Sequence, residues 1–430
     1  MTTSMTDPIY ADAPSRKDPI DAWAVVDTLL LCLVFAVSSD MLVQTGRVQS
    51  LAWMLCYALV AVRIASLWPH YLALVKRNKL IFAYPIVCLA SVVWSVSWVD
   101  SLVFAFQLTM TVVIASFLGW RYSLFALTKA VAFVLALGAL LSLLHWATGI
   151  FPWPVYAKSG ALLGLYSQKN MLGQRTVFVV IAILTLWAMP ATRIRSGLKL
   201  AMILPLFLTI FALFLAKSTT PTLLLPAVVI LWLFLSRHLV PSIVFIPTFG
   251  LGVLVLALGP LLLSANGIDP VQTILDAVGK ESTLTGRTLI WDVARGVYAD
   301  HPFLGVGYRA FWHTPQFLNE QLATEYAGAV TSDSFHNFIL EILVSAGWPG
   351  LIAMLSLIAA TIWRLSRLYS EAHSAEAAGF LVMVVIMVAL SLLGTSLFRG
   401  HEFMLVLMVA VMVSTQEDRL SRAIGTQRRR

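Results

Sequence analysis

A basic side chain stands at the predicted start of a helix in the segment Thr285-Gly-Arg-Thr-Leu-Ile-Trp-Asp-Val-Ala-Arg-Gly-Val. Thr285 can cap this helix. Apolar residues then recur at helical spacing: Ile290, Val293, Ala294 and Val297. Arg287 therefore falls in the first turn, where free backbone N–H groups and the positive helix end add to its guanidinium. This arrangement suits a phosphate or diphosphate, although an arginine on a solvated helix face has the same pattern.

A histidine lies at a second predicted helix start, Asp333-Ser-Phe-His-Asn-Phe-Ile-Leu-Glu. We expect Ser334 to be the N-cap. The apolar face comprises Phe335, Phe338, Ile339, Ile342 and Leu343. His336 and Asn337 lie off that face, at the end of the helix that disfavours imidazolium, so His336 is expected to be neutral and able to accept a proton. The alternative is a histidine that only hydrogen-bonds its neighbours.

Further cations stand where the chain enters apolar segments. Lys169 and Arg175 belong to Gly164-Leu-Tyr-Ser-Gln-Lys-Asn-Met-Leu-Gly-Gln-Arg175, and Lys217 begins Lys217-Ser-Thr-Thr-Pro. The topology given below places all three on the external side, where basic residues are disfavoured. They are candidates for binding an anion, or else they extend to lipid headgroups.

Signatures of metal and nucleotide chemistry are missing from the sequence. His301 and His313 are not in a ligand pattern with carboxylates, and no Asp-x-Asp pair occurs. The sequence also has no phosphate-binding loop and no dinucleotide-binding glycine pattern. We therefore expect chemistry without a metal or cofactor, in which the substrate carries the energy.

The composition requires a membrane to position these residues. Of the 430 residues, 59% are hydrophobic and 12% are charged, and the mean hydropathy is +0.86. These values lie far from those of soluble domains. The net charge of +8 comes from Lys and Arg in short loops, which indicates a topology signal and not nucleic-acid binding. Cys32, Cys56 and Cys88 lie in apolar runs and are expected to be packing residues.

Long apolar runs, each of about 20 residues and able to cross a bilayer, predict an all-α integral membrane protein with about twelve transmembrane helices. The predicted spans are 22–43, 50–69, 80–98, 101–119, 124–148, 173–190, 198–216, 220–236, 241–264, 335–364, 377–398 and 401–415. The first run lacks a cleavage site, so we expect a retained helix.

Basic loops on alternate connections place both termini in the cytoplasm. The predicted organisation is a tail (1–21), helices 1–9 (22–264), a large external loop (265–334), helices 10–12 (335–415) and a basic tail (416–430). Because the loop between helices 9 and 10 is far longer than a turn requires, we expect the chemistry there. Its eight acidic residues outnumber its four basic residues, which fits an external location.

Four motifs occur in an order that resembles the O-antigen ligase and polysaccharide polymerase superfamily. They are Gly164-Leu-Tyr-Ser-Gln-Lys-Asn-Met-Leu-Gly, Leu284-Thr-Gly-Arg-Thr-Leu-Ile-Trp, His301-Pro-Phe-Leu-Gly-Val-Gly-Tyr and Phe335-His-Asn-Phe-Ile-Leu-Glu-Ile-Leu-Val-Ser-Ala-Gly. The Leu-Thr-Gly-Arg-Thr and Lys-Asn forms are most similar to the exopolysaccharide polymerase (ExoQ-like) branch. The motifs cover about residues 160–350.

The resemblance implies a multi-pass protein of the bacterial inner membrane, with a large periplasmic loop and an active site facing the periplasm. It implies an undecaprenyl-diphosphate-linked glycan as donor and a saccharide as acceptor, with polysaccharide assembly and export proteins as candidate partners. By motif, Arg287 and His336 match functional residues of the family. Arg175 and Lys169 match less closely, because Ser-Gln precedes Lys-Asn here.

The chemistry of glycosyl transfer agrees with these roles. Negative charge accumulates on the leaving diphosphate, where Arg287, Arg175 and Lys169 would stabilise it. His336 is the candidate base for the acceptor hydroxyl, and single displacement would invert the anomeric carbon. Asn337, Arg309 and Lys217 are further candidates for substrate binding.

Three other functions remain open at the level of sequence. The same chemistry could transfer a finished chain to lipid A-core, as a ligase does, or to a protein hydroxyl. A twelve-helix transporter is the alternative from another class. Transporters usually carry ionisable residues near the bilayer midplane, whereas the predicted spans have few, with Asp40 and Arg63 as candidates near span ends.

Overall fold

The structure is a computed structural model that describes residues 22–157, 159–239, 248, 285–314, 334–392, 394 and 397–427. Most of the predicted ninth span and of the large loop, together with the tail 1–21, lie outside the described residues. Within the described residues the fold is helical, and two residues, Tyr156 and Leu162, form a lone antiparallel bridge.

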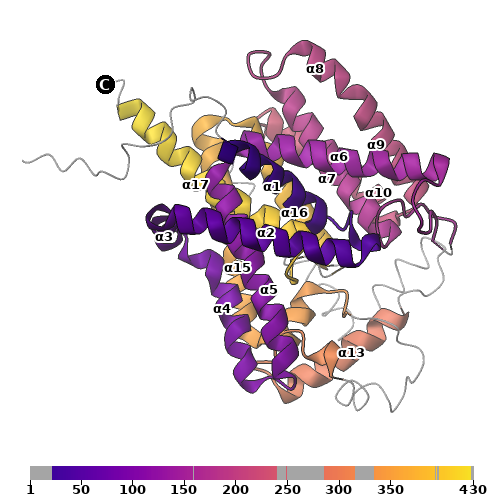
Figure 1. Ribbon diagram of the computed structural model, residues 1–430, viewed down its shortest axis with the longest axis vertical. Coiled ribbons are helices and arrows are strands. Elements are labelled where there is room, and N and C mark those ends of the chain that lie inside the picture. Colours follow the sequence, from indigo (N-terminus) through magenta and orange to yellow (C-terminus); the bar gives the residue numbers. More distant parts are fainter. Residues whose placement is uncertain are drawn as a thin grey trace, which may run out of the picture.

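The first half of the chain forms helices that run back and forth (Figure 1). They are α1 (Ala22–Ser38), α2 (Arg47–Ser66), α3 (Trp68–Arg77), α4 (Ala83–Ala90), α5 (Trp98–Arg121), α6 (Leu124–Thr148), α7 (Lys169–Ala188), α8 (Ser196–Ala201), α9 (Ile203–Ala216) and α10 (Thr219–Ser236). Short 3-10 turns extend α4 on both sides, at Lys79–Phe82 and Ser91–Trp94.

The second half contributes α13 (Thr285–Asp300), α15 (Phe338–Ala372), α16 (Ala375–Leu392) and α17 (Phe403–Gln427). In Figure 1, α13 lies at the lower edge of the molecule and α8 at the upper edge. The last helix runs well past the predicted span end at 415, through most of the predicted basic tail.

Eight of the described helical segments are long and apolar enough to cross a bilayer, and three shorter apolar segments (Trp23–Ser38, Lys79–Trp94 and Phe403–Glu417) accompany them. On α9, Leu204, Phe207 and Phe214 are each more than 60% exposed. An apolar face of this kind is stable against lipid and not against water. The chain is therefore a multi-pass membrane protein. The count of twelve spans stays a prediction.

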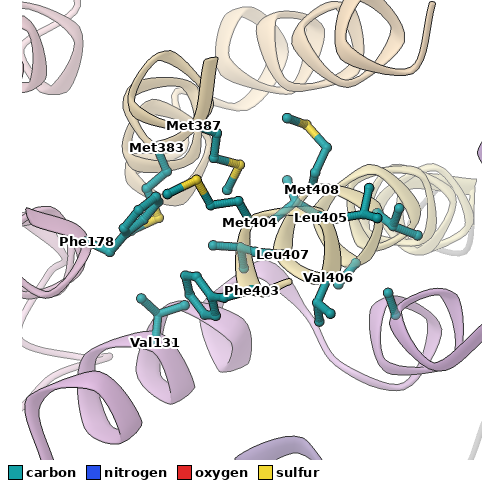
Figure 2. Packing of buried hydrophobic residues seen from close by; sticks show 14 of the residues in the cluster. Val131, Phe178, Met383, Met387, Phe403, Met404, Leu405, Val406, Leu407 and Met408 are labelled. Atoms are coloured by element: carbon teal, nitrogen blue, oxygen red, sulfur yellow. The ribbon is translucent and has the colours of Figure 1, made fainter. Parts of the chain in front are cut away.

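The first half of helix α17 lies in the core of the protein. Every residue from Phe403 to Val413 is buried, as expected for a helix that is apolar on all sides. Figure 2 shows Met404 beside Met383 and Met387 of α16, and Phe403 beside Val131 of α6. This packing fixes the start of α17, where several polar residues of the candidate site lie.

A break in α15 joins the segment 301–310 to the membrane helices. Gly347 has a φ of +59°, and Pro349 has no N–H to donate to the carbonyl of Ser345. The freed carbonyls of Val344 and Ser345 accept instead from the N–H groups of Val306 (2.8 Å) and Gly307 (3.1 Å). The carbonyl groups freed by the break therefore bind the segment that contains the predicted His301-Pro-Phe-Leu-Gly-Val-Gly-Tyr motif.

Candidate functional site

The helix predicted to carry Arg287 is present as α13, and Arg287 is its third residue. The predicted first-turn position is thus confirmed for the backbone. The apolar face of α13 packs as predicted: Ile290, Ala294 and Val297 are buried in a small cluster with Phe335 and Val344. The helix that carries Arg287 therefore packs beside the segment that contains His336.

The start of α15 differs from the prediction. The N-cap is Asn337 and not Ser334, and the Asn337 Oδ1 accepts from the N–H groups of Ile339 (3.0 Å) and Leu340 (3.3 Å). His336 has a φ of +51°, a left-handed conformation that a helix starting at Phe335 could not contain. His336 therefore lies in a bend just before the helix, and the Asn337 oxygen, proposed from sequence for substrate, serves as a cap.

Two side chains hold the peptide groups around Phe335. The Trp291 indole N–H of α13 donates to the Phe335 carbonyl (2.7 Å). The Glu341 carboxylate of α15 accepts from the Phe335 N–H (2.7 Å). Glu341 is 1% exposed, and Arg399 and Arg309 are its electrostatic neighbours.

Arg175 is buried at 1% exposure in the second turn of α7. Its Nε donates to the Ser39 carbonyl (3.3 Å), and its Nη2 donates to Glu402 just before α17 (3.1 Å). Its guanidinium lies 5.2 Å from the centre of the Phe403 ring. Arg175 therefore does not extend to lipid headgroups, and its charge is compensated within the protein.

Asp40 and Glu402 add negative charge around Arg175. Burial raises the pKa of Glu402 to about 7, while Arg175 opposes the shift and Asp40 adds to it. Burial likewise raises the pKa of Asp40, against the attraction of Arg175 and Arg399. Since Arg399 acts on these two carboxylates and on Glu341, one charged network extends from Arg175 to the α15 start.

Arg309 lies at the other side of this network. It follows the docked glycine segment with a φ of +57°, and its backbone N–H donates to the Ser345 hydroxyl (3.4 Å). Its guanidinium stacks over the ring of Phe104, 4.0 Å from the centroid. The structure thus brings Arg309 and Arg175, which are far apart in sequence, to the same end of the helices.

His401 was not identified from the sequence. It stacks on Trp53 of α2, with ring centroids 4.1 Å apart, and contacts the Tyr57 hydroxyl. Burial, helped by Arg309, lowers the pKa of His401 to about 4. It is therefore a neutral ring near pH 7 within the charged network.

The two lysines predicted from sequence lie at the edge of the candidate site. Lys169 is the half-buried first residue of α7, and Lys217 is exposed in a left-handed turn after α9. The next residues, Asn170 and Ser218, are joined by a hydrogen bond of 2.9 Å. Both lysines thus stand on the same side as Arg175, at the point where α9 meets α10.

Charged residues at the opposite end of the helices form separate ion pairs. Asp27 accepts from Arg63 through both oxygens (2.8 and 2.9 Å) and from Arg121 (3.1 Å). Arg63, a sequence candidate for an intramembrane charge, is therefore paired in the structure. Arg193 and Glu376 form another ion pair at this end.

Sequence reasoning did not identify Asp40, Arg399, His401, Glu341 and Glu402 as members of one network. A signal was present, because an ionisable side chain in or beside an apolar run usually requires a buried partner. Among the described residues, no group of three or more His, Cys, Asp or Glu side chains could hold a metal ion.

Comparisons with known proteins agree with the sequence motifs. Residues 204–355 match the family described as O-antigen ligase. The chain is also 28% identical over 372 residues to the exopolysaccharide production protein ExoQ of Rhizobium meliloti, and this match covers 84% of this chain and 80% of the relative. The predicted resemblance is thus confirmed.

Proposed function

Because the chain is a multi-pass membrane protein that matches the O-antigen ligase family over residues 204–355 and is similar to ExoQ, we propose that it transfers an undecaprenyl-diphosphate-linked glycan to a sugar hydroxyl. We propose that it acts as a polymerase, extending a polysaccharide. The reaction would take place at the periplasmic face of the bacterial inner membrane, with both termini in the cytoplasm.

The observation that carries this proposal is the convergence at one end of the helices. Helix α13 with Arg287 and the bend with His336 share a buried cluster. The same bend is joined through Glu341 to the charges of Arg309 and Arg399. Fixed cations beside a candidate base are what transfer from a diphosphate requires.

In the proposed step, the acceptor oxygen forms a bond to the anomeric carbon while the bond from that carbon to the phosphate oxygen breaks. The acceptor proton passes to His336, and the lipid diphosphate leaves with the bonding electrons. Arg287, with Arg175 and Lys169 in support, stabilises the charge that develops on the leaving group. We propose one inverting displacement that uses no metal or nucleotide.

The test compares a deletion strain complemented with wild type, His336→Ala or Arg287→Ala at equal expression. We expect either variant to lower polymer yield by about 10²-fold or more, since a positioned base alone contributes about 10²–10⁴-fold. Single repeat units should accumulate on the lipid carrier. Polymer at the wild-type level in both variants would refute the assignment of these residues.

A ligase is the second candidate, because the matched family is described by that activity. The same strains separate the two reactions. A polymerase defect removes secreted polymer and leaves single units on the carrier. A ligase defect removes long chains from lipopolysaccharide and leaves them on the carrier.

A further inference from the structure

The peptide groups on both sides of Phe335 are held between two helices. The Phe335 carbonyl accepts from Trp291 of α13, and its N–H donates to Glu341 of α15, each at 2.7 Å. The Phe335 ring is fully buried and packs against Phe311 and Trp312, with centroids 5.1 and 4.7 Å away. Neither polar group of this residue is left to water.

His336 is the next residue, so its position follows from the Phe335 peptide. A left-handed conformation at a non-glycine residue is strained and persists only where its surroundings impose it. On the other side of His336, Asn337 is fixed as the cap of α15. The bend is thus anchored on both sides.

We infer that Trp291 and Glu341 are positioning residues that set His336 relative to the helix carrying Arg287. Trp291 follows Arg287 by four residues, one turn along α13. One hydrogen bond therefore joins the helix of the candidate phosphate ligand to the backbone of the candidate base. This inference rests on the proposed function, because it assigns a purpose to the position of His336.

A role in stability alone explains these contacts less well. In the apolar cluster around Phe335 a phenylalanine would fill much of the volume of Trp291, so the specific contribution of the indole is its N–H group. A carboxylate is costly to bury without partners, and the partners of Glu341 are the Phe335 N–H and the charges of Arg399 and Arg309. Fixing the Phe335 peptide has a catalytic use, because misplacing a reacting group by about 1 Å can cost about 10²-fold in rate.

The first test replaces Trp291 by Phe. The matched control is Trp187→Phe, since the Trp187 indole also donates to a backbone carbonyl, that of Lys199 (2.9 Å), at the opposite end of the molecule. Initial rates are measured in membrane vesicles, with lipid-linked saccharide extracted from the deletion strain as donor. Melting temperatures are measured on each protein purified in detergent.

We expect Trp291→Phe to lower kcat by about 10- to 100-fold with KM for the donor changed less than about threefold, because misplaced reacting groups slow the chemical step. The control should retain kcat to within about threefold, with the two proteins melting at similar temperatures. Equal kcat values in the two variants would overturn the role of Trp291.

The second test varies Glu341. Glu341→Gln keeps an oxygen for the Phe335 N–H, and Glu341→Leu does not. We expect Gln to retain much more kcat than Leu, while Glu376→Gln, a change of a buried glutamate at the opposite end, has little effect. Equal losses with Gln and Leu, or no loss with Leu, would contradict positioning through this hydrogen bond.

His336→Ala in the same assay separates the proposed role of His336 from the positioning roles of Trp291 and Glu341. If wild type is active and His336→Ala is inactive, the Trp291 and Glu341 results decide the inference alone. If His336→Ala is as active as wild type, the proposed role of His336 fails, and with it any positioning of that residue for catalysis.

Discussion

Near the candidate site, one buried tyrosine hydroxyl makes no hydrogen bond with the described residues. Tyr166 is fully buried, and its hydroxyl has no hydrogen-bond partner among the described residues. The hydroxyl is pressed against α6, where a side-chain carbon added at Gly138 would lie 2.5 Å from it. Leaving a buried hydroxyl unsatisfied costs about 1–3 kcal/mol.

Tyr166→Phe should therefore leave the melting temperature unchanged or raise it, because it removes only the unsatisfied oxygen. The control is Tyr308→Phe, since the buried Tyr308 hydroxyl donates to the Phe398 carbonyl (2.9 Å). That change should cost about 0.5–1.5 kcal/mol. A larger loss of stability in Tyr166→Phe than in the control would mean that the Tyr166 hydroxyl stabilises the fold, for example through ordered water.

His401 should make stability depend on pH. Its pKa of about 4 in the folded protein lies below the ordinary 6.5, so the unfolded chain binds the proton more strongly between these values. Its contribution is complete above pH 6.5 and is lost as pH falls toward 4, by about 1 kcal/mol at pH 5.5.

Thermal melting in detergent at pH 7.5 and 5.5 checks this dependence. His401→Gln, which cannot titrate, should show a smaller drop in melting temperature at pH 5.5 than wild type. An equal drop in both proteins would assign the pH effect to other groups.

The contacts between distant residues of the candidate site could not be predicted from sequence. Arg175 and Glu402 are 227 positions apart, and only the folded arrangement, in which Phe178 of α7 contacts Phe403 at the start of α17, brings them together. His336 and Arg309 were candidates because of their motifs. Their left-handed backbone conformations, however, depend on the segments against which they pack. Ser334 was expected to cap α15, but the left-handed bend at His336 makes the helix begin at Phe338, with Asn337 as its cap.

At the scale of elements, periodicity predicted the helices well. The apolar face of α13 was read correctly because a helix of this length has one dominant stripe. The break in α15 was not predicted. Although Gly347 and Pro349 permit a break, its geometry is set by the segment 301–310, which supplies hydrogen bonds from elsewhere in the chain.

The docking of that segment requires glycine at position 305. Its φ is +67°, and an added side-chain carbon would lie 2.4 Å from the Val344 carbonyl oxygen. Gly305→Ala should therefore destabilise the protein by about 1–3 kcal/mol through backbone strain and the clash, and polymer yield should fall.

The control is Gly197→Ala in α8, where the added carbon has open space. Alanine in a helix is favoured over glycine by up to about 1 kcal/mol, so this variant should melt at the same or a higher temperature. Similar melting of the two variants would show that the segment tolerates movement away from α15.

At the scale of the whole molecule, the proposed orientation follows from the basic loops. Arg175, Lys217 and Arg309 would face the periplasm, while Arg63, Arg121 and Arg237 would face the cytoplasm. Helix α10 gives a direct check, because an exposed basic residue flanks each of its ends: Lys217 and Arg237.

Cysteine placed at Lys217 should react with a membrane-impermeant maleimide in cells with a permeabilised outer membrane. Cysteine placed at Arg237 should react only after the inner membrane is opened. The native background is low, because Cys56 and Cys88 are buried and Cys32 is half-buried. The reverse pattern would invert the topology and move the candidate site to the cytoplasm.

Burial raises the pKa values of the two carboxylates that face Arg175, those of Asp40 and Glu402. A diphosphate bound beside Arg175, as proposed, would raise the pKa values of Asp40 and Glu402 further, because like charges repel. Since burial already raises the pKa of Glu402 to about 7, binding of the proposed donor would be accompanied by proton uptake, and the affinity for the donor would rise as the pH falls. In the proposed orientation, donor capture would then respond to the pH of the periplasm.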